Sequence, residues 1–115
     1  MIEEGTATAA DIDKAIRYGF GPRYAAMGVV EFIDFGGLDI LYHASRYLSS
    51  RLDPAHYAAP RIIDDKMRAG ELGVKTGQGL YTWDAQQAQR FQRDALARLV
   101  RILEINMQDQ QAQTR

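Results

Sequence analysis

Apolar residues recur along most of the chain with the three- and four-residue spacing of an amphipathic α-helix. This pattern predicts helices over about 8–18, 24–35, 38–52, 60–69 and 84–110. Glycine and proline mark the breaks, which are placed at Gly19, Gly21 and Pro22, at Gly36-Gly37, at Asp53-Pro54 and at Gly70. Since no alternating pattern extends beyond about four residues, we predict an all-α fold of about five helices.

Two helix features are specific enough to test. Thr8 and Asp11 have the spacing of a capping box, in which each side chain binds the other residue's backbone N–H. The final helix carries an apolar seam, widened by Ile102 and Ile105, whose main members are Leu96, Leu99, Val100, Leu103 and Met107. The glutamine-rich end, residues 108–115, is expected to fray.

Length and composition fit one globular domain. The chain has 115 residues, of which 46% are hydrophobic and 25% charged, with a formal net charge of −1. That balance argues against binding to nucleic acid or to anionic lipid. The absence of cysteine excludes disulfides, thiolate metal sites and a cysteine nucleophile. No apolar run reaches the ~20 residues of a membrane span, and no signal peptide is recognisable, so a cytoplasmic protein is expected.

Few side chains suggest chemistry by themselves. His43 and His56 lack the spacing of a metal site, and we predict neither a metal ligand set nor a catalytic residue. The acidic pairs are predicted to be structural, with Asp39 favouring the start of a helix and Asp34 sharing a helix side with apolar residues. The arginines of the final helix are interrupted by acids and are expected to form a solvated face.

The least helical segment, residues 70–83, holds four of the ten glycines. Successive glycines allow backbone N–H groups to converge on an anion, and Lys75 adds a mobile positive charge. The segment lacks the spacing of a phosphate loop or a dinucleotide fingerprint. These residues alone leave open both a phosphate contact and a plain connection between helices.

Three segments together resemble the C-terminal domain of the 3-hydroxyacyl-CoA dehydrogenase family, which includes 3-hydroxybutyryl-CoA dehydrogenases. They are residues 3–15 (EEGTATAADIDKA), residues 27–39 (MGVVEFIDFGGLD) and residues 70–81 (GELGVKTGQGLY). The family has a proline where this chain has Val29 and an aromatic residue where it has Leu80. The resemblance covers residues 2 to about 83, so we predict a family domain over 1–83 and a helical extension over 84–115.

The resemblance implies a fold like the C-terminal domain of 6-phosphogluconate dehydrogenase, with a glycine-rich loop before a long final helix. It implies an enzyme that uses NAD to interconvert L-3-hydroxyacyl-CoA and 3-oxoacyl-CoA in fatty-acid or hydroxybutyryl metabolism. In that enzyme a Rossmann domain precedes this one and supplies the catalytic histidine and glutamate, and an asparagine lies just upstream. The isolated chain is therefore expected to be inactive.

The resemblance also implies roles for residues present in this chain. Lys75 matches a family lysine that reaches the bound NAD. Gly73, Gly77 and Gly79 would shape the loop. The helical domains would form a homodimer and wall the acyl-CoA cleft, with core or interface packing by Met27, Val30, Leu38, Leu41 and Tyr42.

Two other readings stay open. One is a non-catalytic helical dimerisation or assembly module, which the apolar seam of the last helix also fits. The other is the same domain in a dehydrogenase of a hydroxy acid that is not a CoA ester.

Overall fold

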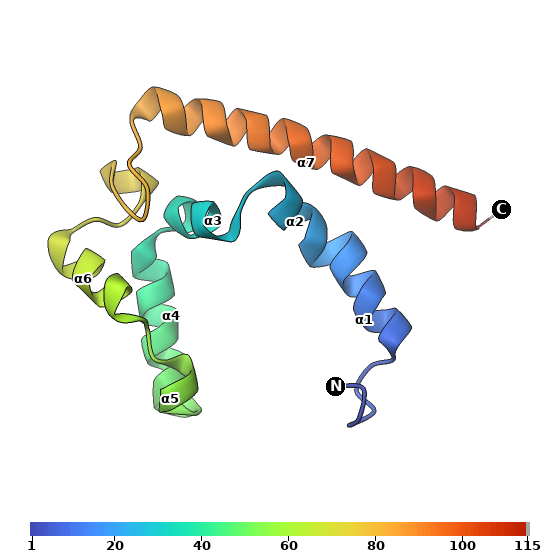
Figure 1. Ribbon diagram of the computed structural model, residues 1–115, viewed down its shortest axis with the longest axis horizontal. Coiled ribbons are helices and arrows are strands. Elements are labelled where there is room, and N and C mark those ends of the chain that lie inside the picture. The colour runs from blue at the N-terminus through green and yellow to red at the C-terminus, as the bar shows by residue number, and fades with distance from the viewer. Residues whose placement is uncertain (115) are drawn as a thin grey trace. The chain divides into compact units, whose positions relative to one another are not determined.

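The computed structural model describes residues 1–114 and confirms the all-α prediction for them (Figure 1). The elements in chain order are α1 (Ala9–Ala15), a π-helical turn η1 (Ile16–Phe20), α2 (Gly21–Ala26), α3 (Val29–Gly36), α4 (Leu38–Arg51), α5 (Pro54–Tyr57), α6 (Arg61–Ala69), a 3-10 turn η2 (Val74–Thr76) and α7 (Ala85–Gln113). The chain divides into two compact units. The first joins Met1–Gly28 to the part of α7 from Phe91 onward, and the second is Val29–Arg90. Among the described residues no helix is both long and apolar enough to cross a membrane.

The first helix begins as predicted, with a complete capping box. The backbone N–H of Asp11 donates to the Thr8 hydroxyl at 3.1 Å, and the N–H of Thr8 donates to the Asp11 carboxylate at 3.1 Å. These bonds satisfy two donors that a helix start otherwise leaves free. The Thr8 hydroxyl also donates to the Asp11 carboxylate at 2.8 Å, and this bond, followed by the one from the Thr8 N–H, lowers the pKa of Asp11 below its usual value.

The predicted helix stop at Gly19, Gly21 and Pro22 is wrong. The chain stays helical through this segment to Ala26 and breaks at Met27 and Gly28 instead. A π-helical turn inserts one extra residue per turn, so that the N–H of Gly21 reaches back to the carbonyl oxygen of Ile16. Pro22 then occupies the first turn of α2, directly after this change of hydrogen-bond register, and its fixed φ is compatible with the helix.

The buried face of α7 differs in part from the predicted seam. Ala95 is buried and Leu99, Ile102 and Asn106 are half-buried, and the Asn106 amide donates to the carbonyl oxygen of Arg17 at 3.2 Å. The other seam members are exposed: Leu96 by 60%, Val100 by 48%, Leu103 by 41%, Ile105 by 57% and Met107 by 58%. This leaves an apolar stripe uncovered along α7.

The expectation that residues 108–115 fray is wrong up to Thr114; Arg115 lies outside the described residues. The helix continues to Gln113, and the N–H of Thr114 still donates to the carbonyl oxygen of Gln110 at 3.3 Å. Glutamine is a good helix former, so a run of glutamines extends a helix that is already nucleated.

In the second unit α4 packs against α3, α5 and α6 (Figure 1). Leu38 is fully buried and Ile63 nearly so. The predicted helices 38–52 and 60–69 are confirmed, and the second of them ends at Gly70 in the left-handed conformation. The single turn of α5 was not predicted. It is capped by Asp53, which accepts from the N–H of Ala55 at 3.0 Å.

The five residues predicted to pack in a core or an interface differ in burial. Leu38 is buried, while Met27, Leu41 and Tyr42 are half-buried. Val30 is 39% exposed. Only Leu38 of these five therefore belongs to the interior of the described chain.

Candidate functional site

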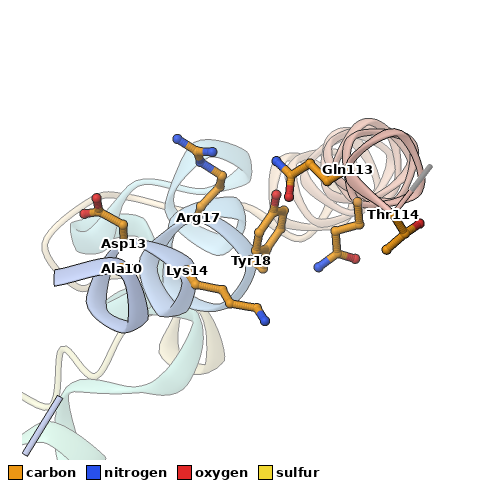
Figure 2. Close-up of a pocket in the computed structure, with 8 residues that line it drawn as sticks. Ala10, Asp13, Lys14, Arg17, Tyr18, Gln113 and Thr114 are labelled. Atoms are coloured by element: carbon orange, nitrogen blue, oxygen red, sulfur yellow. The ribbon is translucent and has the colours of Figure 1, made fainter. Parts of the chain in front are cut away.

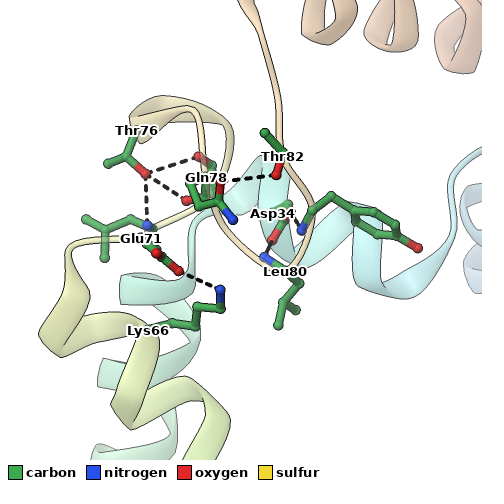
Figure 3. A network of polar contacts seen from close by, with 10 residues as sticks. Asp34, Lys66, Glu71, Thr76, Gln78, Leu80 and Thr82 are labelled. Carbon is green, nitrogen blue, oxygen red and sulfur yellow. Dashed lines mark hydrogen bonds and ion pairs between the residues drawn. The ribbon is translucent and has the colours of Figure 1, made fainter.

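The loop that follows α6 is anchored on one buried carboxylate, that of Asp34 near the end of α3 (Figure 3). Asp34 Oδ1 accepts from the N–H of Leu80 at 2.9 Å, and Oδ2 accepts from the N–H of Tyr81 at 2.8 Å. The indole N–H of Trp83 also donates to Oδ2, at 2.9 Å. Three donors compensate for removing this charge from water, so the loop and α3 form one rigid block.

Loop N–H groups do meet an anion, but they belong to Leu80 and Tyr81 rather than to glycines, and the anion is the protein's own carboxylate. Three glycine N–H groups of the loop are used inside the loop. Gly73 donates to Gln78 at 2.9 Å, Gly77 to Val74 at 3.1 Å and Gly79 to Tyr81 at 2.8 Å. These backbone groups therefore do not form a phosphate cradle, and the backbone acts as a structural connection.

The loop requires glycine where it meets Asp34. Gly73 has a φ of +113°, and a Cβ there would collide with the backbone carbonyl oxygen of Asp34. A Cβ on Gly79 would lie 2.6 Å from Asp34 Oδ1. Because backbone lies against backbone at Gly73, no side-chain movement can relieve the first contact.

Side chains fix the rest of the loop. The Thr76 hydroxyl accepts from the N–H of Leu72 at 2.9 Å and lies 2.9 Å from the carbonyl oxygen of Gln78 (Figure 3). Lys66 on α6 pairs with Glu71 at 2.5 Å. The carbonyl oxygen of Leu72 accepts from the N–H of Leu38 at 2.9 Å, which ties the loop to the first residue of α4.

Lys75, the predicted cofactor contact, lies on η2 and pairs with Asp39 in the first turn of α4. The ammonium Nζ lies 2.5 Å from Asp39 Oδ1, and the two side chains are 47% and 25% exposed. The hydrogen bond from Lys75 is the main cause that lowers the pKa of Asp39 below its usual value, against the opposing effect of desolvation. Sequence reasoning identified both residues but not their pairing, which spans 36 positions.

The anchoring role of Asp34 and Trp83 was missed. A carboxylate on the same helix side as apolar residues was the available clue. Its partners lie 46 to 49 positions away, however, and nothing in the local sequence connects them. The two histidines are exposed and make edge-on ring contacts with their neighbours Tyr42 and Tyr57.

A separate cavity of about 630 Å³ lies in the first unit, between α1 with its π turn and the last turns of α7 (Figure 2). Lys14, Arg17 and Asp13 contribute charged side chains, and Gln113 contributes an amide. The Tyr18 ring stands between the two helices, and its hydroxyl is buried without a hydrogen-bond partner among the described residues. The lining is thus mixed in charge.

A comparison with protein families matches residues 1–83 to the model described as 3-hydroxyacyl-CoA dehydrogenase, C-terminal domain. The 3-hydroxybutyryl-CoA dehydrogenase of Mycobacterium tuberculosis is 35% identical over 83 residues, which are 72% of this chain and 28% of that protein. The 5-formyl-3-hydroxy-2-methylpyridine 4-carboxylate 5-dehydrogenase of Mesorhizobium japonicum is 28% identical over 105 residues, which are 91% of this chain and 34% of that protein.

Among solved structures, the crystal structure of a 3-hydroxyacyl-CoA dehydrogenase from Archaeoglobus fulgidus is similar, with a TM-score of 0.73 and 29% identity. The similarity covers 90% of this chain and 36% of that one. The chain thus spans about a third of the length of these relatives. The Mesorhizobium and Archaeoglobus similarities both cover more of the chain than the 83 residues of the family match, and so include part of α7.

Proposed function

We propose a function from one premise: the chain belongs to the 3-hydroxyacyl-CoA dehydrogenase family, as that family's C-terminal domain. The proposal is that it completes an NAD-dependent enzyme that interconverts L-3-hydroxyacyl-CoA and 3-oxoacyl-CoA. Within that enzyme the chain would wall the acyl-CoA cleft and form a dimer, and a preceding Rossmann domain would supply the catalytic base. Residues 1–83 would be the family domain, with 84–115 as its helical extension.

One observation supports this most strongly: two of the family-like segments are joined to each other by hydrogen bonds and an ion pair. Asp34 and Asp39 come from the segment 27–39, and their partners Leu80, Tyr81 and Lys75 come from the segment 70–81. The residues that carry the resemblance therefore also hold the loop in place. Such agreement is expected when the segments serve a common site.

The side chain of Lys75 fits the proposed contact with NAD. It is 47% exposed, and its ammonium has two N–H groups besides the one given to Asp39. The glycine N–H groups around it are committed, so the contact would be made by the side chain rather than the backbone. NAD, when bound, would accept the hydride, and Lys75 would hold part of it in position.

The exposed stripe on α7 supports the proposed dimer. Leu96, Val100, Leu103 and Met107 are separated by four, three and four positions, which is the spacing of a helix–helix seam. Sedimentation at several concentrations tests this. A chain that stays monomeric at high concentration would contradict pairing through this domain alone.

A second candidate function comes from the Mesorhizobium relative, whose named substrate is a pyridine carboxylate rather than a CoA ester. Its match covers 91% of this chain, whereas the mycobacterial match covers 72%. A dehydrogenase of a non-CoA hydroxy compound is therefore the alternative. A non-catalytic assembly module is the third possibility. It predicts that the chain has no effect on the turnover of a dehydrogenase to which it is joined.

A chimera separates these candidates. The chain replaces the C-terminal part of the mycobacterial relative, and NADH oxidation is followed with acetoacetyl-CoA and with non-CoA keto acids. We expect turnover of acetoacetyl-CoA by the chimera and none by the chain alone, because the family's histidine–glutamate pair lies in the other domain. Turnover by the pure chain, or a folded NADH-binding chimera without turnover, would refute the proposal. Preference for a non-CoA substrate would favour the second candidate.

A further inference from the structure

A second cavity, of about 490 Å³, lies in the second unit between α4, α6 and the connector that joins α5 to α6. The two helices contact each other directly (Figure 1). Ala58, Ala59 and Met67 contribute apolar side chains to the lining, and Arg46 of α4 and Arg68 of α6 contribute guanidinium groups. This cavity is separate from the glycine-rich loop, and its volume lies within the range of small-molecule sites.

A neighbour on its own helix positions one of the two arginines. The Arg46 guanidinium donates to the Tyr42 hydroxyl at 2.7 Å and lies over the Tyr42 ring, with Cζ 5.4 Å from the ring centroid. A guanidinium has several N–H donors, and this bond uses one of them. The hydroxyl accepts in this bond, so its own hydrogen can still be donated. Both residues line the cavity, and their contact meets part of the ordering cost of a flexible arginine before a ligand binds.

The charges around the cavity favour a ligand with a single negative charge. Among the described residues that line it, Arg46 and Arg68 are positive and Asp64 is negative, which leaves a net formal charge of +1. A carboxylate carries one charge, and its two oxygens match two parallel N–H groups of a guanidinium. A phosphate group carries a charge of about −1.5 to −2 at neutral pH and would be repelled more strongly by Asp64.

We propose that this cavity binds a small organic carboxylate with a short apolar body. The carboxylate would accept from Arg46, Arg68 and the Tyr42 hydroxyl, and the apolar body would contact Ala59 and Met67. The inference goes beyond the proposed function and does not depend on it. It assigns a ligand to a face of α4 and α6 that the loop site does not use.

Titration of the isotope-labelled chain with isobutyrate, followed by the NMR shifts of its backbone amides, tests the site directly. We expect saturable shifts in α4, α6 and the connector, with a dissociation constant in the millimolar range because the ligand is small. Acetate has two fewer carbon atoms and should bind about three- to tenfold more weakly. Inorganic phosphate should also bind more weakly than isobutyrate. The proposal is overturned if isobutyrate causes no saturable shifts, if acetate binds equally well, or if phosphate binds more tightly.

Substitutions identify the groups that bind the carboxylate. Arg46→Met and Arg68→Met should each weaken isobutyrate binding about tenfold, as for the loss of a hydrogen bond to a charged group. Tyr42→Phe keeps the ring and should weaken binding about three- to tenfold. Unchanged binding by both arginine variants would overturn the proposal. Both arginines are exposed, so these variants should keep the circular dichroism of the wild type.

The same helix provides a matched control. Arg51 lies over the Tyr47 ring, with Cζ 5.8 Å from the centroid, so the pair has the same residue types and spacing as Tyr42 and Arg46. Neither Tyr47 nor Arg51 is among the described residues that line the cavity. Arg51→Met should therefore leave isobutyrate binding unchanged. If it weakens binding as much as Arg46→Met does, the ligand responds only to the overall charge of the chain, and the proposal fails.

A change of the opposite sign tests the preference for a single charge. Asp64→Asn raises the net formal charge of the described lining to +2, so phosphate binding should tighten more than isobutyrate binding. This measurement does not require a loss of binding, and a poorly folded variant would not produce it. An unchanged ratio of the two affinities would overturn the assignment of a singly charged ligand.

Discussion

Replacing Asp34 by asparagine tests whether one carboxylate holds the loop on α3. The side chain is fully buried and accepts three hydrogen bonds at 2.8 to 2.9 Å. Asparagine has nearly the same shape but only one acceptor oxygen, so at least one of the three donors must face an NH₂ group. The surviving bonds also lose their charge assistance. We expect the free energy of unfolding to fall by about 2–4 kcal/mol.

Trp83 is the only tryptophan of the chain, and its indole donates to the carboxylate in question. Urea unfolding is therefore followed by tryptophan fluorescence for the loop and by far-ultraviolet circular dichroism for the helices. Asp65→Asn is the control, since its carboxylate is 55% exposed and lies 3.8 Å from Arg61. The control should change the unfolding free energy by less than about 0.5 kcal/mol. An equally small change for Asp34→Asn would refute the anchoring role.

Three further outcomes are expected. Gly73→Ala should lower the thermal midpoint far more than Gly70→Ala, because both glycines have a positive φ but of the two only Gly73 lies against backbone atoms. Gly70→Ala should cost about 1–2 kcal/mol of unfolding free energy. Equal losses for the two variants would contradict the packing argument. Thr8→Ala should cost about 1 kcal/mol of unfolding free energy in urea through loss of the helix cap, and no loss would show that the cap is dispensable. The hydrogen bond from Lys75 lowers the pKa of Asp39 in the folded protein. The ionised carboxylate of Asp39 therefore stabilises the fold at pH values above its pKa in the unfolded chain, and this contribution is lost as the pH falls through its pKa in the folded protein. The stability difference between the wild type and Asp39→Asn should therefore shrink on acidification below about pH 4, and a difference that stays constant would argue against the pair.

Local features of this fold were predictable because their physics is local. The capping box of Thr8 and Asp11 spans three residues, and the breaks at Asp53-Pro54 and Gly70 follow from backbone chemistry. The π turn was not predictable in the same way. Gly19, Gly21 and Pro22 are helix breakers individually, and only a change of hydrogen-bond register allows them to be absorbed.

The candidate site could be predicted only in part, because only its local features can be read from the sequence. The glycine-rich segment and Lys75 stand out in the sequence, and the loop N–H groups do converge on an anion. That the anion is Asp34, and that Asp39 pairs with Lys75, depends on contacts spanning 36 to 49 positions. Folding brings these residues together through the packing of α3 against α4 and η2, which no local pattern encodes.

A loop bound at Leu72, at Lys75 and at Trp83 cannot change length without breaking one of these attachments. The segment behaves as a fixed spacer, so an epitope tag or a fluorescent label inserted there would disrupt α3 as well. Among the described residues, the connector at Ala58 and Ala59 shows no such attachment beyond the end of α5, and it offers the safer position for insertion.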